Sequence, residues 1–278
     1  MINKQTIKTL LLSILLLNLA ACEAPPEALV GQQSWQNKVI TLYRAKSIIT
    51  LNEREPRANY VAVYKQHIAA VGSRESIAAE LAGATLIEDA RFSEQVIVPG
   101  FISQHIHPAL AALTLDMKII AIEDWALPTG TVAAVHSRAD YLAELKKANK
   151  AMNDYDEPLL SWGYHSDFHG ALSRDDLDAI STDRAIFIWH RSVHAFTLNS
   201  KAIELSGIDN TTIAKLEDSA REQTDLANGH FWEQGLAAVS DHIMGPVVSP
   251  SRLIKGLKFV EDYLLSKGIT LASEPGGL

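Results

Sequence analysis

The chain has 278 residues, of which 47% are hydrophobic and 21% are charged, a composition typical of a folded globular protein rather than a disordered or fibrous one. This length allows one large domain or two smaller ones. The formal net charge of −8 lacks the basic excess with which proteins bind a phosphate backbone, so the composition argues against nucleic acid as a partner.

The first 21 residues have the order of an export signal. Lys4 and Lys8 precede an apolar run over residues 10–17, and small residues then lead to Cys22. The run is shorter than the ~20 residues that cross a hydrocarbon core, so a cleaved signal is favoured over a membrane-spanning helix. Residues 22–37 are expected to form a tether.

Cys22 is the chain's only cysteine, which leaves it no partner for an internal disulfide. It ends a Leu-Ala-Ala-Cys tetrad that resembles the lipobox of bacterial lipoproteins. The resemblance implies a lipid-modified Cys22, with the chain exported and anchored to a bacterial membrane, facing the periplasm or the cell exterior. The simpler alternative is a small hydrophobic residue at the end of a signal peptide.

Residues 38–95 are predicted to form a small β domain. Segments rich in β-branched and apolar residues indicate strands at the ranges 39–43, 47–51, 60–64 and 67–71. A helix over 74–81 follows, and the strand pattern returns at 86–89 and 95–98 before Pro99-Gly100 ends it.

A histidine pair, His105 and His107, comes directly after this turn. In an extended strand the two side chains would project to the same face, and neutral imidazole is a common ligand of divalent metals. The pair alone is a weak signal, because a chain with ten histidines produces such spacings by chance. The residues that precede the pair strengthen this signal.

A β domain, an apolar run, Pro-Gly-Phe-Ile and His-x-His together resemble the opening of the amidohydrolase superfamily. The resemblance implies an α/β fold in which residues 96–278 form the N-terminal part of a TIM (β/α)8-type metal-dependent hydrolase barrel and residues 38–95 form part of a composite β-sandwich. Gln104 stands where the superfamily usually has Ser or Thr, which alters the hydrogen bonding around the ligands.

Residues 96–278 are fewer than the about 250 of a typical complete barrel, so an incomplete barrel is predicted. A parallel sheet left open exposes an edge and an apolar face. The chain is therefore expected to associate with a second chain, or with another copy of itself, that completes the sheet.

Two further segments, Leu177-Asp178-Ala179-Ile180 and Asn199-Ser200-Lys201-Ala202, are similar to amidohydrolase family 3, the branch that contains N-substituted formamide deformylases. This resemblance implies hydrolysis of a carbon-nitrogen bond other than a peptide bond, in a small amide-like or formamide-like substrate. The implied reagent is water activated by a divalent metal, with zinc as the default ion. The catalytic aspartate of these relatives is not assigned to any residue here.

Other candidate site residues lie after a predicted buried strand over 186–189. His190 and His194 are expected beyond its end, where barrel enzymes build their sites, and His165, His190 and His194 are predicted to bind substrate. For His165 and His190, as for His169, an ordinary hydrogen-bonded structural role remains open.

Gly229 and Glu233 match the Gly-x-x-x-Glu pattern of the same branch, which makes Glu233 a predicted third metal ligand. The alternative is a surface glutamate that starts a helix. Further helices are predicted over 138–152 and from Ser249 to Gly268, and Ser173 with Asp176 has the spacing of a capping box.

Two other functions remain open from the sequence. One is a non-catalytic lipoprotein that serves as a binding module, and the other is a ring deaminase of the same superfamily. Metal binding separates the first from an enzyme, and a panel of substrates separates the second from an amide hydrolase.

Overall fold

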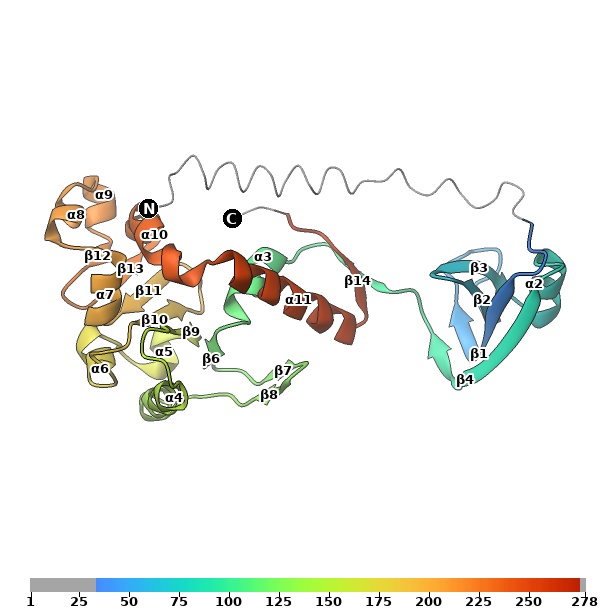
Figure 1. Ribbon diagram of the computed structural model, residues 1–278, viewed down its shortest axis with the longest axis horizontal. Helices are drawn as coiled ribbons and strands as arrows, with labels where there is room; N and C mark the ends of the chain where they lie inside the picture. Colours follow the sequence, from blue (N-terminus) through green and yellow to red (C-terminus); the bar gives the residue numbers. More distant parts are fainter. Residues whose placement is uncertain (1–33, 276–278) are drawn as a thin grey trace. The chain divides into compact units, whose positions relative to one another are not determined.

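The computed structural model of the chain describes residues 34–275 (Figure 1). Cys22, the predicted export signal and most of the predicted tether lie outside these residues. Within the described part, no helix is long and apolar enough to cross a membrane. The chain divides between Pro99 and Gly100 into two compact units.

The first unit is one sheet with a helix packed against it. Its elements are β1 (Val39–Ile49), β2 (Arg57–Tyr64), β3 (His67–Gly72), α2 (Arg74–Glu80) and β4 (Thr85–Ile97). The strand order is β3-β2-β1-β4, and β1 pairs antiparallel with β2 and parallel with β4. Ile40 and Leu42 of β1 pack against Ile77 of α2 in a buried core.

Two strands of the structure were each predicted as two shorter strands. The ranges 39–43 and 47–51 fall on β1, and 86–89 and 95–98 fall on β4. The register between these two strands shifts on either side of Ala45, as at a β-bulge. A bulge breaks the alternation of apolar and polar side chains, so the sequence pattern is interrupted where the strand is not. The predicted helix over 74–81 is confirmed as α2, with Ser73 as its N-cap.

The second unit is built around a six-stranded mixed sheet. Its strands are β6 (Lys118–Ile119), β9 (Leu159–Tyr164), β10 (Ile186–His190), β11 (Ala195–Leu198), β12 (Thr224–Asp225) and β13 (His230–Trp232). The order is β12-β13-β11-β10-β9-β6. β6, β9 and β10 run parallel, whereas β11, β13 and β12 continue the sheet with antiparallel pairings.

Helices lie on both faces of this sheet (Figure 1). They are α3 (Pro108–Thr114), α4 (Arg138–Ala151), α5 (Ser166–His169), α6 (Arg174–Asp178), α7 (Ser200–Ser206), α8 (Asn210–Ala214), α9 (Asp218–Arg221), α10 (Glu233–Val247) and α11 (Pro250–Ser266). A hairpin of β7 (Trp125–Leu127) and β8 (Gly130–Val132) lies outside the sheet.

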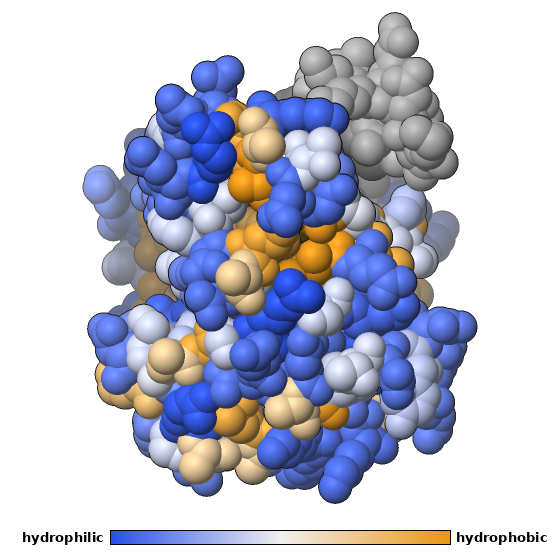
Figure 2. Space-filling model, turned by 90° about the vertical axis from the view of Figure 1, so that its left-hand side faces the viewer, coloured by the Kyte–Doolittle hydropathy of each residue, from blue (hydrophilic) through white to orange (hydrophobic). Residues whose placement is uncertain are grey.

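Alternate side chains of β10 point to opposite faces of the sheet, as strand geometry requires. Phe187 packs with residues of α3, α7, α10 and α11, and Ile188 packs with Tyr141 and Leu145 of α4 and Leu177 of α6. The sheet is thus the middle layer of three. Apolar residues also reach the surface of this unit in a band among hydrophilic ones (Figure 2).

The local helix signals in this unit are confirmed. Helix α4 matches the range predicted over 138–152, and Ser173 and Asp176 form a complete capping box at the start of α6. Ser249 caps α11, and Gly268 closes it with a φ of +75°. Within α11, Val260 is buried, whereas Ile254 is 70% exposed and Leu257 is 42% exposed.

The mixed α/β class is confirmed, but the described residues close no barrel. The strand predicted over 186–189 was expected to belong to the barrel, but it lies in the open six-stranded sheet. β10 is a central strand of the six-stranded sheet, next to the antiparallel β11. A run of four buried apolar residues fits either environment, because a strand covered on both faces has the same pattern in each.

A separate pair of parallel strands lies outside the six-stranded sheet. β5 (Phe101–Ser103) pairs with β14 (Ile269–Ala272), which follows α11, and the whole six-stranded sheet lies between them in the sequence. A Cβ atom on Gly100 would lie 2.1 Å from Thr270 Oγ1, so glycine is needed where the chain enters β5.

These two strands pair only with each other among the described strands, and their apolar side chains are uncovered. Phe101, Ile102 and Leu271 are 58%, 62% and 59% exposed. An apolar sheet with two free edges is a surface on which another strand can pair.

Candidate metal site

His105 and His107 lie in the loop that follows β5 and not on the strand itself. The strand ends at Ser103, so alternation along a strand, from which their common direction was predicted, does not position them. His107 instead precedes Pro108 and is the N-cap of α3. The two rings still meet edge to face, with centroids 5.5 Å apart and planes at 89°. The loop brings together the two imidazoles that the sequence singled out.

A carboxylate that the sequence did not single out joins this pair. Glu274 Oε1 lies 2.6 Å from His107 Nδ1, and the two side chains are 29% and 47% exposed. Glu274 follows β14, whose carboxyl end lies beside that of β5 because the two strands are parallel. The sequence signal was present in a strand pattern that ends in Ser273-Glu274-Pro275, but the pairing of β14 with β5 was not predicted.

Glu233 lies elsewhere in the second unit. It is the first residue of α10, as in the alternative interpretation, and its carboxylate lies 3.1 Å from His194 Nδ1. Both side chains are exposed, at 54% for Glu233 and 62% for His194. Among residues 34–275 no three His, Cys, Asp or Glu side chains are placed to hold one ion together, so Glu233 does not join the histidine pair in this arrangement.

The backbone around Glu233 and His194 is strained. Glu233 has a φ of 44° and Val193 a φ of 62°, values that non-glycine residues rarely adopt. The N–H of Glu233 donates to the carbonyl of His194 at 2.9 Å, which ties the two residues together through the backbone as well. Such strain persists only where the surroundings impose it, and it occurs often at functional positions.

His165 and His169 are engaged in local hydrogen bonds. His165 caps the short helix α5, with Nδ1 accepting from the N–H of Asp167 at 3.3 Å. His169 is buried; its Nδ1 accepts from the N–H of His165 and its Nε2 donates to the carbonyl of Val135 at 2.8 Å. Burial lowers the pKa of His169. Because both nitrogens of His169 are used, its role in this structure is structural.

His190 is part of a series of stacked rings at one end of the six-stranded sheet. Its ring stacks on that of His230, with centroids 5.2 Å apart, and His230 stacks on Trp232 at 4.8 Å. The ring of Tyr164 meets His190 edge to face, with centroids 4.6 Å apart. His190 Nε2 lies 2.9 Å from Thr197 Oγ1. The sequence did not predict His230 and Trp232 as neighbours of His190, because the antiparallel pairing of β13 with β11 was not foreseen.

Burial, with a smaller effect from His230, lowers the pKa of His190 to about 3. The imidazole is therefore neutral at pH 7. Burial also lowers the pKa of His230, so the stack presents two uncharged imidazoles side by side.

These shifts predict that acid destabilises the protein. Between pH 6.5 and about 3 the unfolded chain takes up a proton at His190 that the native state does not. The free energy of unfolding therefore falls as the pH falls through this window, by at most about 1.4 kcal/mol per pH unit from this group. His190→Gln is expected to make the dependence shallower in urea unfolding at pH 7.5 and pH 5, whereas the exposed His67→Gln leaves it unchanged. Equal dependence in all three proteins contradicts the prediction.

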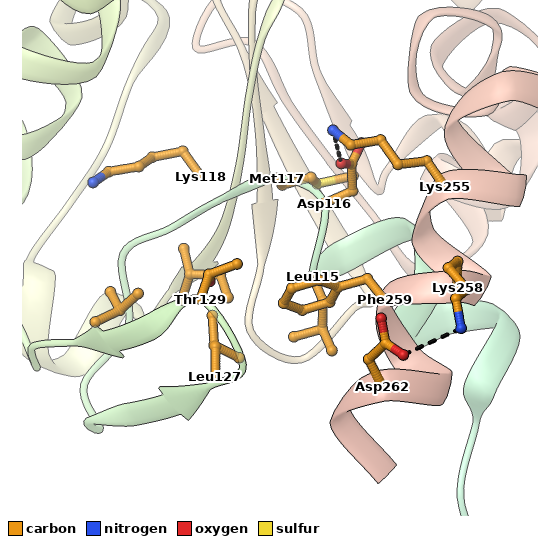
Figure 3. A pocket seen from close by; sticks show the side chains of 12 residues that line it. Leu115, Asp116, Met117, Lys118, Leu127, Thr129, Lys255, Lys258, Phe259 and Asp262 are labelled. Atoms are coloured by element: carbon orange, nitrogen blue, oxygen red, sulfur yellow. Dashed lines mark hydrogen bonds and ion pairs between the residues drawn. The ribbon is translucent and has the colours of Figure 1, made fainter. Parts of the chain in front are cut away.

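A cavity of about 470 Å³ lies between α11, the β7–β8 hairpin and residues 115–119 (Figure 3). Asp116 lies at its wall, 2.7 Å from Lys255 Nζ and 3.1 Å from Arg252 Nη2. The strands β6, β9 and β10 run parallel, and the cavity reaches the start of β6. His190 is the last residue of β10, so it lies at the opposite end of these strands. None of the predicted site residues lines it, so it is separate from the histidine pair.

No family model matches the chain. Among curated proteins, the chain is similar to the exoenzymes regulatory protein AepA of Pectobacterium carotovorum subsp. carotovorum, with 29% identity over 178 residues. The matched part is 62% of this chain and 35% of that protein. The chain thus spans about a third of the length of this curated relative.

Among solved structures, the chain is similar to two uncharacterized metal-dependent hydrolases. The one from Pyrococcus horikoshii OT3 has a TM-score of 0.60 and 18% identity, over 84% of this chain and 42% of that one. The one from Pyrococcus furiosus has a TM-score of 0.59 and 19% identity, over 84% and 44%. These likenesses show a shared fold, of which this chain spans less than half.

Proposed function

We propose that this chain, whose fold is that of metal-dependent hydrolases, binds a divalent metal at His105 and His107 and takes part in hydrolysis of a carbon-nitrogen bond other than a peptide bond. One observation carries the proposal. Two imidazoles converge at the carboxyl ends of two adjacent parallel strands, which is where hydrolases with parallel barrels build their sites.

The two histidines suit a divalent ion. Both are exposed, and among residues 34–275 no group hydrogen-bonds to Nε2 of His107. Neutral imidazole binds zinc and other divalent first-row metals, so zinc is the default ion and not the only one accepted. When bound, such an ion supplies Lewis acidity and lowers the pKa of water.

The class of substrate comes from the resemblance to N-substituted formamide deformylases. We propose a small amide-like or formamide-like molecule, with His165, His190 and His194 as the substrate-binding residues. His194 is the most exposed of these and is held by Glu233. His190, uncharged at pH 7, would offer a neutral hydrogen-bonding group. Glu233 as a third metal ligand stays a prediction.

The partner surface is proposed to be the β5–β14 pair, on which a second copy or a second chain continues the sheet. Leu271 is uncovered and lies on a strand with a free edge. For the first residues we propose the exported, lipid-anchored state, with Cys22 as the modified residue. Loss of membrane attachment in Cys22→Ser, followed by fractionation of cells, tests that state.

Association through β14 gives a direct prediction. Leu271→Lys is expected to shift the purified protein toward the monomer in size-exclusion chromatography with light scattering, because a charge on a free strand opposes pairing. Leu205→Lys is the matched control, since Leu205 is 54% exposed and Leu271 is 59% exposed. A monomeric wild-type protein at all concentrations, or equal effects of both substitutions, contradicts the proposal.

The function is tested by assaying the full chain, loaded with zinc, against N-substituted formamides, simple amides and ring amines. We expect the protein to release amine from the amide-like compounds. This activity should be lost on chelation, restored by zinc and absent from the His105→Ala, His107→Ala variant. His67→Ala should retain it. Turnover of ring amines alone would favour the deaminase, and a metal-loaded protein without turnover would favour the binding module.

A further inference from the structure

We propose that Glu274 is a positioning residue for the metal site. In this role its carboxylate fixes the tautomer and the orientation of His107, so that the Nε2 lone pair is the one available to the ion. The inference rests on the proposed function and adds to it a residue from the far end of the second unit.

The contact is short enough to be a charge-assisted hydrogen bond. His107 Nδ1 and Glu274 Oε1 are 2.6 Å apart. An ionised carboxylate only accepts hydrogen bonds, so Nδ1 must carry the proton and donate. In a neutral imidazole the other nitrogen, Nε2, then has the lone pair. A carboxylate on the distal nitrogen of a metal-binding histidine also raises the basicity of the ligand.

The backbone holds both partners in place. β5 and β14 pair in parallel, and the ladder continues past their ends, where the N–H of Ser273 donates to the carbonyl of Ser103 at 2.9 Å. The N–H of Ile106 donates to the carbonyl of Ser273 at 3.2 Å. These bonds fix the residues next to His107 and Glu274, which are 167 positions apart in the sequence. Pro275 further restricts the backbone of Glu274 to extended conformations.

Among the described residues, the side chain of His107 has no hydrogen-bond partner other than Glu274. His107 is the N-cap of α3, yet its side chain makes no capping hydrogen bond. Capping of α3 therefore does not orient the ring, which is held by its hydrogen bond to Glu274 and by its edge-to-face contact with His105. The ring of His105 lies on the same loop, with its centroid 5.5 Å away.

A plain surface ion pair is the alternative explanation of the contact. The two side chains are partly exposed, and such pairs contribute little to stability. A surface pair predicts no effect on metal affinity. A positioning role predicts two effects that can be measured independently of turnover, one on the tautomer and one on affinity.

The tautomer is read from the imidazole ¹⁵N shifts of the metal-free full chain at pH 8, where an ordinary histidine is neutral. His107 is expected as the Nδ1–H form in the wild type. It should remain so in Glu274→Gln, whose amide oxygen accepts the same bond, and shift toward the Nε2–H form in Glu274→Ala. An unchanged tautomer in Glu274→Ala overturns the inference, and an unchanged thermal melt checks that the variants fold.

Zinc affinity is measured by competition with a chromophoric chelator. Glu274→Ala is expected to weaken binding by about 10- to 100-fold, the range for loss of a residue that orients a ligand. Glu274→Gln should retain most of the affinity, and Glu204→Ala, an exposed glutamate on α7 paired with Lys201, should retain all of it.

The outcomes separate this inference from the proposed function. Equal affinity in Glu274→Ala and the wild type overturns the positioning role and leaves the metal site in place. Equal losses in the Gln and Ala variants would make the carboxylate itself a ligand and also overturn it. A wild-type chain that binds no zinc overturns the proposed function, and with it any role of Glu274 toward a metal.

Discussion

Replacing Arg184 with methionine is expected to lower the free energy of unfolding by about 4 kcal/mol. Arg184 is fully buried, yet the groups around it are neutral acceptors. Its Nε donates to Asn149 Oδ1 at 2.8 Å, and its Nη atoms donate to backbone carbonyls in the loop after α4, those of Met152, Asp154 and Glu157. Methionine has similar bulk and no donor, so these buried acceptors would lose their partners, at about 1–3 kcal/mol for each that water cannot reach.

Urea unfolding of the full chain, followed by circular dichroism, measures this effect. Arg221→Met is the control, because Arg221 is 44% exposed and pairs on the surface with Asp218, an interaction worth less than about 1 kcal/mol. If Arg184→Met unfolds within about 1 kcal/mol of the wild type, Arg184 does not hold the loop as described, and the stability of the second unit has another source.

The second large effect concerns the metal. The His105→Ala, His107→Ala double variant is expected to lose zinc affinity by more than about 100-fold, beyond the loss that follows removal of a residue that only orients a ligand. The reason is that both imidazole donors of the converging pair are removed, and no third ligand is placed beside them among residues 34–275.

Mass spectrometry of the metal content after dialysis checks the prediction, with His67→Ala as the control. His67 is an exposed histidine of the first unit, at the start of β3. Equal metal content in the double variant and the wild type would mean that any bound ion lies at other residues.

Local features of the fold were predictable from the sequence. The caps at Ser173 and Ser249 and the helix α4 depend on residues within one or two turns of each other, and all three are present. The strands of the first unit were also predictable, although the bulges around Ala45 made β1 and β4 each look like two shorter strands.

Strand pairing was not predictable, because it depends on residues far apart in the sequence. The buried run at Ile186 looked like a barrel strand, since covered strands in parallel and mixed sheets share one pattern. For the same reason, the contact between His107 and Glu274 was not predicted. A motif identified His107 near the start of the second unit, whereas Glu274 is brought to it from the other end of that unit by the pairing of β14 with β5. The motif was sufficient to predict the two histidines, whereas the carboxylate beside them depends on how the strands pair.

The proposed metal site is tested most directly by anomalous diffraction from crystals of the full chain grown with zinc, with data collected on both sides of the zinc absorption edge. The prediction is one strong anomalous peak in bonding contact with His105 and with Nε2 of His107, about 2.0–2.1 Å from the nitrogen, while Nδ1 keeps its contact with Glu274. A peak only at other residues, or no peak at these histidines with zinc in excess, would contradict the account.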